Sequence, residues 1–224
     1  FADLAHDLAT PVSTVLSLVD TLRRPDLVTT PAEQTRMLGM LETEVERLAR
    51  LVADIRDLAH LDDPDVRFER EPADVADVVV RASAGLAAAR RQHPIEFDLQ
   101  HAVAPVDSVR VEQLVQNLLA NAIRHAGPAS RITVRVEDGA DEVLLTVEDD
   151  GVFITDDVLE RLGERFYRPD ASRDTRTGGL GLGLSIVAAI VARHEGGVCF
   201  VRNEPQGLRV HVRLPKTLPS TEAP

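Results

Sequence analysis

The sequence predicts an α-helical hairpin that pairs with a second copy as a four-helix bundle, followed by an α+β sandwich. Three observations lead to this fold class. Apolar residues recur at helical spacing through the first sixty residues. An acidic, proline-containing break at residues 62–65 is typical of a linker. Beyond it, strands and helices follow one another without regular alternation, which favours an α+β sandwich.

The first helix is expected to run from the start of the chain to about residues 23–24. Its apolar residues form one stripe, and Pro11 within it should bend the helix, because proline removes an amide donor and clashes with the preceding turn. His6 lies off this stripe, directly before Asp7. The stripe consists of Phe1, Leu4, Leu8, Val12 and Val15.

An exposed histidine beside a carboxylate is a usable nucleophile, since the unperturbed imidazole pKa is about 6.5. From this stretch alone, an ordinary surface histidine is the simpler interpretation of His6. The motifs later in the chain change that interpretation.

The second helix has clear start signals. Thr30 is expected to be the N-cap, with Pro31 at the first helical position and Glu33 completing a capping box. The helix should reach about Leu61, and its apolar spacing alternates between three and four residues, as in a heptad seam. Dimerisation would bury the apolar stripes of both arms. The alternative is a hairpin that packs on the rest of its own chain. The seam positions are Leu38, Leu41, Val45, Leu48, Val52, Ile55 and Ala59.

The remaining elements are predicted from periodicity and turn signals. Gly127-Pro128 and Gly196-Gly197 each end a helix, and Asp138-Gly139 is a strong hairpin signal. The tail after Pro215 is expected to fray. We expect strands at residues 66–71, 95–99, 131–136, 142–148, 198–202 and 208–214, the last two forming a hairpin, and helices at residues 75–91, 109–126 and 182–194.

Composition excludes several classes of function. The net charge of −12 argues against general nucleic-acid binding. The single cysteine, Cys199, excludes an internal disulfide or a thiolate metal cluster, and its apolar strand predicts a place in the core. We find no signal peptide and no apolar run long enough to span a bilayer. Because Phe1 already lies in a helical pattern and is not methionine, we expect a longer protein whose preceding part could hold a membrane anchor.

A polar face on the predicted helix at residues 109–126 is the first sign of a ligand site. Asn117, Asn121, Arg124 and His125 share one face, opposite the leucines. Amide side chains can ligate Mg²⁺ through oxygen and donate to phosphate through nitrogen. A merely polar solvent face is the alternative, although asparagine is a poor helix former.

Two further stretches suggest a nucleotide. Asp149 stands at a strand end, before Gly151, where a carboxylate can accept from an exocyclic amine such as that of adenine; an acidic turn is the simpler alternative. Four glycines at residues 177–184 precede a helix, which suits phosphate. They match neither the Walker pattern nor the dinucleotide fingerprint. The long intervening segment, residues 152–176, is expected to be a lid.

Five motifs occur in a telling order: His-Asp-Leu-x-Thr-Pro, Asn-Leu-Leu-x-Asn-Ala, Asp-x-Gly, Glu-Arg-Phe-Tyr-Arg and Gly-Leu-Gly-Leu. In this order they resemble the H, N, G1, F and G2 boxes of the transmitter region of bacterial two-component sensor histidine kinases, over about residues 1–214. The resemblance implies a dimerisation and phosphotransfer hairpin at residues 1–63, an ATP-binding domain of the Bergerat ATPase type at 66–216, and a flexible tail at 217–224.

The resemblance also implies roles for individual residues. His6 would be the phosphoacceptor, Asp7 the acid/base that orients it, and Thr10 a residue that positions water when a phosphorylated regulator is dephosphorylated. Asn117 and Asn121 would bind Mg²⁺-ATP, with Asn121 as the metal ligand. The other residues implied in nucleotide binding are Arg124, His125, Asp149, Gly151, Phe166, Arg168, Gly179, Gly181, Leu182, Gly183 and Leu184.

The implied function is autophosphorylation of a homodimer from ATP and Mg²⁺, followed by transfer to an aspartate of a response regulator. The fragment would be cytoplasmic, from a sensor anchored in the inner membrane. Two departures from the family pattern stand out. Phe153 replaces the second glycine of Asp-x-Gly-x-Gly and would strain or crowd the site if that glycine needs positive φ or a close approach to the nucleotide. Ala9 replaces a basic residue, which should cost a surface contact and leave the chemistry intact.

Two other functions remain open at this point. One is a relay or phosphatase-biased module in which Phe153 has impaired nucleotide binding. The other is an ATPase of the same broad fold, of the chaperone or gyrase type, against which the hairpin bearing His6 argues.

Overall fold

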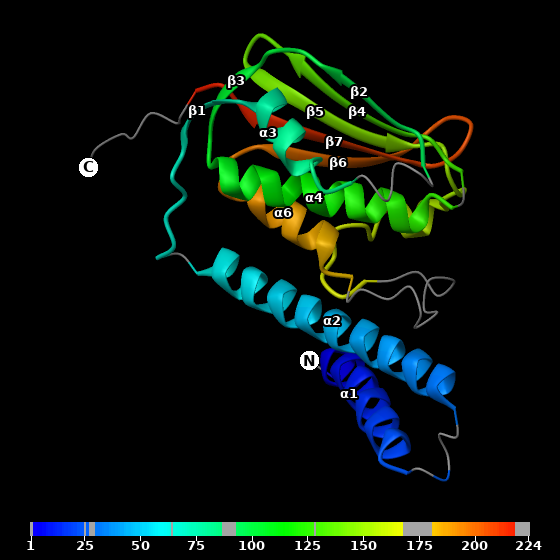
Figure 1. The fold of residues 1–224 in the computed structure, drawn as a ribbon. Helices are drawn as coiled ribbons and strands as arrows, with labels where there is room; N and C mark the ends of the chain where they lie inside the picture. Colours follow the sequence, from blue (N-terminus) through cyan, green and yellow to red (C-terminus); the bar gives the residue numbers. More distant parts are fainter. Residues whose placement is uncertain are drawn as a thin grey trace.

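The structure is a computed structural model, and it describes residues 2–24, 26, 30–63, 65–86, 93–127, 129–167 and 181–217, with side chains described from residue 8 onward. Figure 1 shows two parts: a helical hairpin, and a sheet region in which helices cover one face of a β-sheet. None of the helices in these ranges has the length and apolar character that crossing a bilayer requires.

The hairpin consists of α1 (Ala2–Leu22) and α2 (Pro31–Asp62), which pack side by side (Figure 1). The predicted capping box is confirmed. The Glu33 amide donates to Thr30 Oγ1 at 3.2 Å, and the Thr30 amide donates to Glu33 Oε2 at 3.1 Å. These bonds satisfy amide groups that have no partner within the helix. Pro11 lies inside α1, which continues past it for eleven residues.

The sheet region contains a five-stranded sheet in the order β2-β4-β5-β7-β6 and a two-stranded ladder of β1 and β3. β2 is parallel to β4, and the other neighbours are antiparallel, which confirms both predicted hairpins. The strands are β1 (Glu71–Asp74), β2 (Ile95–Leu99), β3 (Val103–Val106), β4 (Ile132–Asp138), β5 (Glu142–Asp149), β6 (Gly197–Arg202) and β7 (Leu208–Pro215).

Three helices lie on one face of the five-stranded sheet (Figure 1): α3 (Val75–Ala82), α4 (Ser108–His125) and α6 (Gly183–Arg193). Alternate strand residues point to opposite faces, so the inner positions of β4, β5 and β7 are buried while outer positions carry polar side chains. The core is aliphatic. Its largest fully buried members include Leu114, Leu118, Leu119, Ile132, Leu145, Ile186, Ile190 and Leu214.

The α2 helix connects the two parts through apolar contacts. Leu51, Leu58 and Leu61 are buried in the same cluster as the core of the sheet region, and α2 packs on α6. The alternative considered for the hairpin, packing on its own chain, therefore holds for the end of α2. The rest of the hairpin keeps an apolar seam exposed: Leu38, Val45 and Val52, seven residues apart, are 50%, 47% and 55% exposed.

Polar contacts hold the same junction. Arg165 donates to both carboxylate oxygens of Asp62, at 2.7 and 2.5 Å. Arg193 of α6 donates to the main-chain carbonyls of Asp63, at 3.0 Å, and of Val66. The segment that follows α2 is thus fixed by side chains of the sheet region and not by strand pairing.

Several elements differ from the prediction. The strand expected at residues 66–71 is wrong, since pairing begins at Glu71 in β1, and β3 was not predicted. Each of these two strands contains a proline, Pro72 opposite Pro105, and proline argues against strand assignment from sequence alone. Helix α3 ends at Ala82 instead of about residue 91, because the chain turns at residues 83–86, which include Gly85. The short helix α5 (Asp156–Leu159) was not predicted.

The predicted burial of Cys199 is also wrong. Cys199 is exposed, on the outer face of β6 opposite His211 of β7. Its neighbours Val198 and Phe200 point inward and pack against the core. The apolar run therefore does not mark a strand buried on both faces, because none of the described helices lies over the outer face of this sheet (Figure 1).

Candidate functional site

Asp149 lies at the last position of β5, on the same sheet face as the core. Its side chain is buried, and Oδ1 accepts from the Gly151 amide at 3.0 Å. Burial raises the pKa of this carboxyl above its usual value, while hydrogen bonds from the main-chain amides of Gly151 and Leu208 oppose that rise. A buried acceptor held by main-chain donors suits a ligand that brings a further donor, such as an exocyclic amine.

Gly151 must be glycine because the end of α4 lies against it. A Cβ atom at this position would meet the Ala126 carbonyl oxygen at 2.2 Å and its Cα at 2.3 Å. This close approach joins the loop after β5 to the C-terminal end of α4, so that Asp149 and the polar face of α4 border the same place.

The predicted polar face of α4 is present. Asn117 and Asn121 are half-buried, and Arg124 and His125 are exposed in the last turn. Asn117 donates through Nδ2 to the Gln113 carbonyl at 3.0 Å, which leaves Oδ1 directed at Gly183, where a Cβ atom would lie 3.4 Å from it. An amide oxygen thus faces the N-terminus of α6.

The start of α6 presents main-chain amides. Gly181 has a φ of 71°, which favours glycine, and Leu182 is 1% exposed and anchors the turn in the core. Gly183 begins the helix, and the N-cap residue, Leu182, makes no side-chain capping hydrogen bond. Leu184 packs against the core. An uncapped helix N-terminus carries partial positive charge and free N–H groups, the features that bind phosphate.

Phe166 belongs to the segment predicted as a lid. It packs against the core, and its φ of 64° is unusual for a residue with a side chain. Arg161 lies over the ring of the neighbouring Tyr167, with Cζ 4.0 Å from the ring centre. Arg168 and Gly179, which were assigned to the nucleotide, lie outside the described residues.

The substitution Phe153 does not strain the backbone. Positive φ occurs at Ala129, Phe166 and Glu195 among the described non-glycine residues, and Phe153 is not one of them. Its side chain is 60% exposed, with Arg202 Cζ 4.6 Å from the ring centre. The backbone strain that was considered for Phe153 is therefore absent. The Phe153 ring lies against Arg202 of β6.

The three residues assigned to phosphotransfer lie on α1. His6 and Asp7 are helical in the main chain, and their side chains lie outside the described part. Thr10 is half-buried, and its carbonyl accepts from Thr14 Oγ1 at 3.1 Å. The structure thus places these residues on the hairpin, apart in sequence from the glycine-rich and asparagine-bearing elements.

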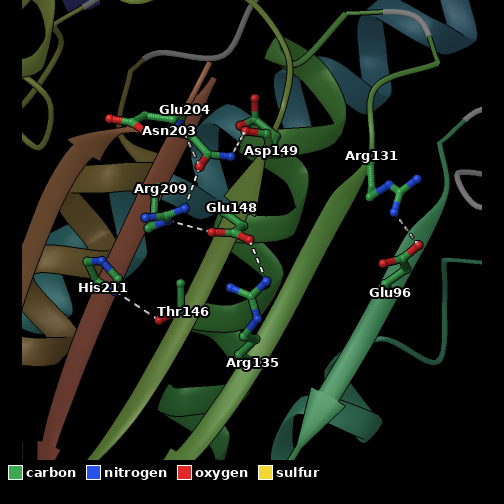
Figure 2. Close-up of polar contacts among 10 residues, drawn as sticks. All are labelled: Glu96, Arg131, Arg135, Thr146, Glu148, Asp149, Asn203, Glu204, Arg209 and His211. Carbon is green, nitrogen blue, oxygen red and sulfur yellow. Dashed lines mark hydrogen bonds and ion pairs between the residues drawn. The ribbon is translucent and has the colours of Figure 1, made fainter. Parts of the chain in front are cut away.

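Sequence reasoning missed the turn between β6 and β7. Asn203 donates through Nδ2 to the Asp149 carbonyl at 2.8 Å, and a Cβ atom at Gly207 would meet the same carbonyl oxygen at 2.0 Å (Figure 2). The only sequence signal was a polar residue and a glycine in a hairpin turn, which many turns share. These residues border the site because β7 lies next to β5.

Together these residues have the chemistry to bind a purine nucleoside triphosphate. The Asp149 carboxylate can accept from a base, the α4 amides can contact phosphate, and the α6 N-terminus can bind anionic oxygens. The amide oxygen of Asn117 that faces α6, together with the Asn121 side chain one turn later, also fits Mg²⁺. Mg²⁺ prefers oxygen ligands and takes its remaining ligands from phosphate and water.

Two family models match the chain. Residues 1–64 match the His Kinase A phospho-acceptor domain, and residues 106–218 match the histidine kinase-, DNA gyrase B- and HSP90-like ATPases. Among curated proteins, the chain is similar to the probable sensor histidine kinase TcrY of Mycobacterium tuberculosis, with 36% identity over 216 residues that cover 96% of this chain and 45% of TcrY. The chain spans about half the length of the curated relatives it matches.

Two solved structures share the fold. The histidine kinase AdeS of Acinetobacter baumannii gives a TM-score of 0.78 at 22% identity, over 95% of this chain and 98% of that one. The histidine kinase ThkA, solved in complex with the response regulator protein TrrA, gives 0.76 at 19% identity, over 96% and 60%. At these identities the likeness shows the arrangement of a helical hairpin followed by an ATPase-type sheet.

Proposed function

Because this chain belongs to the histidine kinase-, DNA gyrase B- and HSP90-like ATPases, and among them to the sensor histidine kinases, we propose that it is an ATP-dependent protein-histidine kinase that phosphorylates itself on His6. One observation carries the proposal. The loop that follows the buried Asp149 packs against the end of α4, and farther back along α4 the Asn117 amide faces the start of α6. α4 would thus border both a base acceptor and a phosphate site.

In the proposed reaction, an imidazole nitrogen of His6 attacks the γ-phosphorus, and the bond to the bridging oxygen breaks as ADP leaves. Asp7 would accept a hydrogen bond from the other ring nitrogen and hold the neutral tautomer. Phosphoryl transfer depends mainly on positioning and on neutralising charge. When bound, Mg²⁺ would offset the negative charge on the phosphate oxygens.

The proposed nucleotide contacts take the roles that the family resemblance implies. Asp149 would accept from the adenine amine, and Gly151 would let the loop after β5 pack closely against the end of α4. Asn121, with Asn117 beside it, would hold the Mg²⁺-bound phosphates, and Arg124 and His125 would contact phosphate or ribose from the last turn of α4. Gly181, Leu182, Gly183 and Leu184 would shape the phosphate-binding start of α6.

A homodimer is part of the proposal, and the exposed apolar seam supports it. Leu38, Val45 and Val52 of α2 recur every seven residues and remain about half exposed in one chain. Val12 and Leu16 of α1 are also exposed, at 41% and 60%. Two such hairpins would bury these side chains in a four-helix bundle.

The proposed partner is a response regulator, which would receive the phosphoryl group on an aspartate. ThkA, which shares the fold, was solved with such a regulator. Thr10 would take part in the reverse role, dephosphorylation of the regulator. The residues would form the cytoplasmic part of a longer sensor anchored in the inner membrane, with working boundaries at residues 1–63 and 66–216.

The test is autophosphorylation with γ-labelled ATP and Mg²⁺. The parent chain should gain acid-labile, alkali-stable label, and His6→Gln should gain none. His60→Gln is the matched control, because His60 is an exposed histidine on the other helix of the hairpin. Label that survives in His6→Gln would show that another residue is the acceptor.

Absence of label on every variant would favour the relay or phosphatase function. In that case ATP affinity of the parent and of Phe153→Gly decides the cause. The exposed position of Phe153 leads us to expect ATP affinities that agree within about threefold, a difference of less than about 0.7 kcal/mol.

A further inference from the structure

We propose that Asn203, in the turn between β6 and β7, is a positioning residue for base recognition: it holds the main chain of Asp149 so that the carboxylate is presented to the base. The inference rests on the proposed function, in which Asp149 accepts from the adenine amine. Asn203 belongs to none of the five motifs, lies 54 residues from Asp149 in sequence, and is 7% exposed.

The turn between β6 and β7 contacts both the main chain and the side chain of Asp149. Asn203 Nδ2 donates to the Asp149 carbonyl at 2.8 Å, and the Leu208 amide donates to the Asp149 carboxylate. Gly207 has a φ of 106°, and a Cβ atom there would lie 3.0 Å from Oδ1 of Asp149 as well as against its carbonyl. The main chain and the side chain of Asp149 are therefore both held by this one turn.

The orientation of the Asn203 amide is determined by its partners. Oδ1 accepts from Arg209 Nη2 at 2.6 Å and from the Glu204 amide at 3.0 Å, so the nitrogen must face the Asp149 carbonyl. Figure 2 shows this side chain between Arg209 and Asp149. A side chain with both ends bonded has little freedom to move and can fix its neighbour.

Arg209 is itself held across the sheet. Its Nε donates to Glu148 Oε2 at 2.5 Å, and the other oxygen of Glu148 pairs with Arg135 at 2.9 Å (Figure 2). Glu148 is 8% exposed, on the outer face of β5, one residue before Asp149. A continuous set of bonds thus runs from β4 through β5 and β7 to Asn203, and it ends on Asp149.

The consequence concerns discrimination between bases. A site built to bond an amine rejects an analogue that lacks the amine, but only while the acceptor is in place. Loss of the Asn203 bond would free the Asp149 carbonyl and let the carboxylate shift. The contribution of the adenine amine to the binding free energy of ATP should then fall, while the contacts of the protein with the purine ring and the phosphates persist.

The experiment compares the affinity of the whole chain, with Mg²⁺, for ATP and for purine riboside 5′-triphosphate, which lacks the amine. Asn203→Asp keeps the shape and the acceptor for Arg209 and replaces the donor. We expect it to bind ATP about tenfold more weakly and the analogue within about twofold of the parent, so that the preference for ATP falls. Arg209→Gln should lower the preference in the same direction but less.

Thr146→Val is the matched control, because Thr146 lies on the same outer face and its hydroxyl contacts His211, which is not one of the hydrogen-bonding partners described above for Asn203 and Asp149 (Figure 2). It should keep the preference of the parent. Equal losses of both ligands in Asn203→Asp and in Arg209→Gln would show a merely structural role and overturn the inference.

Asp149→Ala separates the proposed role of Asp149 in base recognition from the proposed role of Asn203 in positioning it. If it retains the preference for ATP, the base is read elsewhere, and the proposed role of Asp149 fails together with this inference. If it abolishes the preference while Asn203→Asp retains it, only the role of Asn203 is overturned.

Discussion

The hairpin and the sheet region contain the same types of aliphatic residue but bury them to different extents. In the sheet region, Leu118, Ile132 and Leu145 are at most 1% exposed, because helices on one face and strands beneath them enclose each side chain. In the hairpin, Leu16 and Val52 remain 60% and 55% exposed, because no described element covers the side of the hairpin on which they lie. A sheet region of this kind completes its own core, whereas a two-helix hairpin depends on a further partner.

The largest contrast should appear on truncating a core side chain. Leu118→Ala in α4 should lower the free energy of unfolding by about 2–5 kcal/mol, since the side chain is enclosed and leaves a cavity. Val109→Ala on the same helix, where Val109 is 74% exposed, should change it by less than about 0.5 kcal/mol. Urea unfolding followed by circular dichroism measures both. Equal losses would mean that α4 is not packed as described.

Charged substitutions in the exposed seam of the hairpin should weaken dimerisation and leave the folding of the sheet region unchanged. Leu38→Glu together with Val52→Glu places two charges in the proposed seam, and each should weaken dimerisation by about tenfold or more. Sedimentation equilibrium gives the dimer affinity, and nucleotide affinity should stay unchanged. Glu42→Gln, at an exposed position of the same helix, serves as control. A dimer that survives the double substitution would place the interface elsewhere.

Acid should weaken the sheet region through His194. This buried side chain accepts from the Asp107 amide at Nε2 and contacts the Ile190 carbonyl at Nδ1, so the fold requires its neutral form. Burial lowers its pKa below 6.5, with Arg70 adding to the effect and Asp107 opposing it. The unfolded chain then binds more protons, and stability falls as pH drops below 6.5 towards the folded-state pKa.

The slope from this one group cannot exceed about 1.4 kcal/mol per pH unit. His194→Gln should flatten the curve between about pH 6.5 and 5. Chemical unfolding at a series of pH values measures the difference. An unchanged slope would show that other groups, such as His211, whose pKa burial also lowers, dominate in acid.

The smallest effect is expected at the junction of the two parts. Arg165→Gln removes the pair with Asp62, whose side chains are about half exposed, and should cost about 0.2–1 kcal/mol. Limited proteolysis at residues 62–65 should become faster, and the difference should shrink in high salt. Arg161→Gln is the control, because Arg161 pairs with Glu164 within the sheet region. Equal cleavage rates would show that apolar contacts alone hold the junction.

Elements with local signals were predicted well. The capping box at Thr30, the hairpin at Asp138-Gly139 and the stop of α4 all depend on residues within a few positions of each other. β1 and β3 were missed because each contains a proline and because their pairing joins segments about thirty residues apart. The place of Cys199 depended on which face of the sheet the helices cover.

The candidate site divides in the same way. Residue type and spacing identified the α4 face, Asp149 and the start of α6, because these side chains carry chemistry that few other residues supply. Asn203 and Gly207 were missed, because an asparagine and a glycine in a turn have no distinctive spacing. Their role follows from the strand order, which places β7 beside β5.

The sequence by itself determined α1, α2, α4, α6 and both hairpins of the five-stranded sheet, and it suggested most of the residues of the candidate site, since periodicity, caps and turn residues act over a few positions. Only the tertiary structure decided which sheet face is covered, how α2 docks on α6, and that the β6–β7 turn supports Asp149. The physical reason is that these contacts join residues distant in sequence, whose partners are set by the packing of the whole chain.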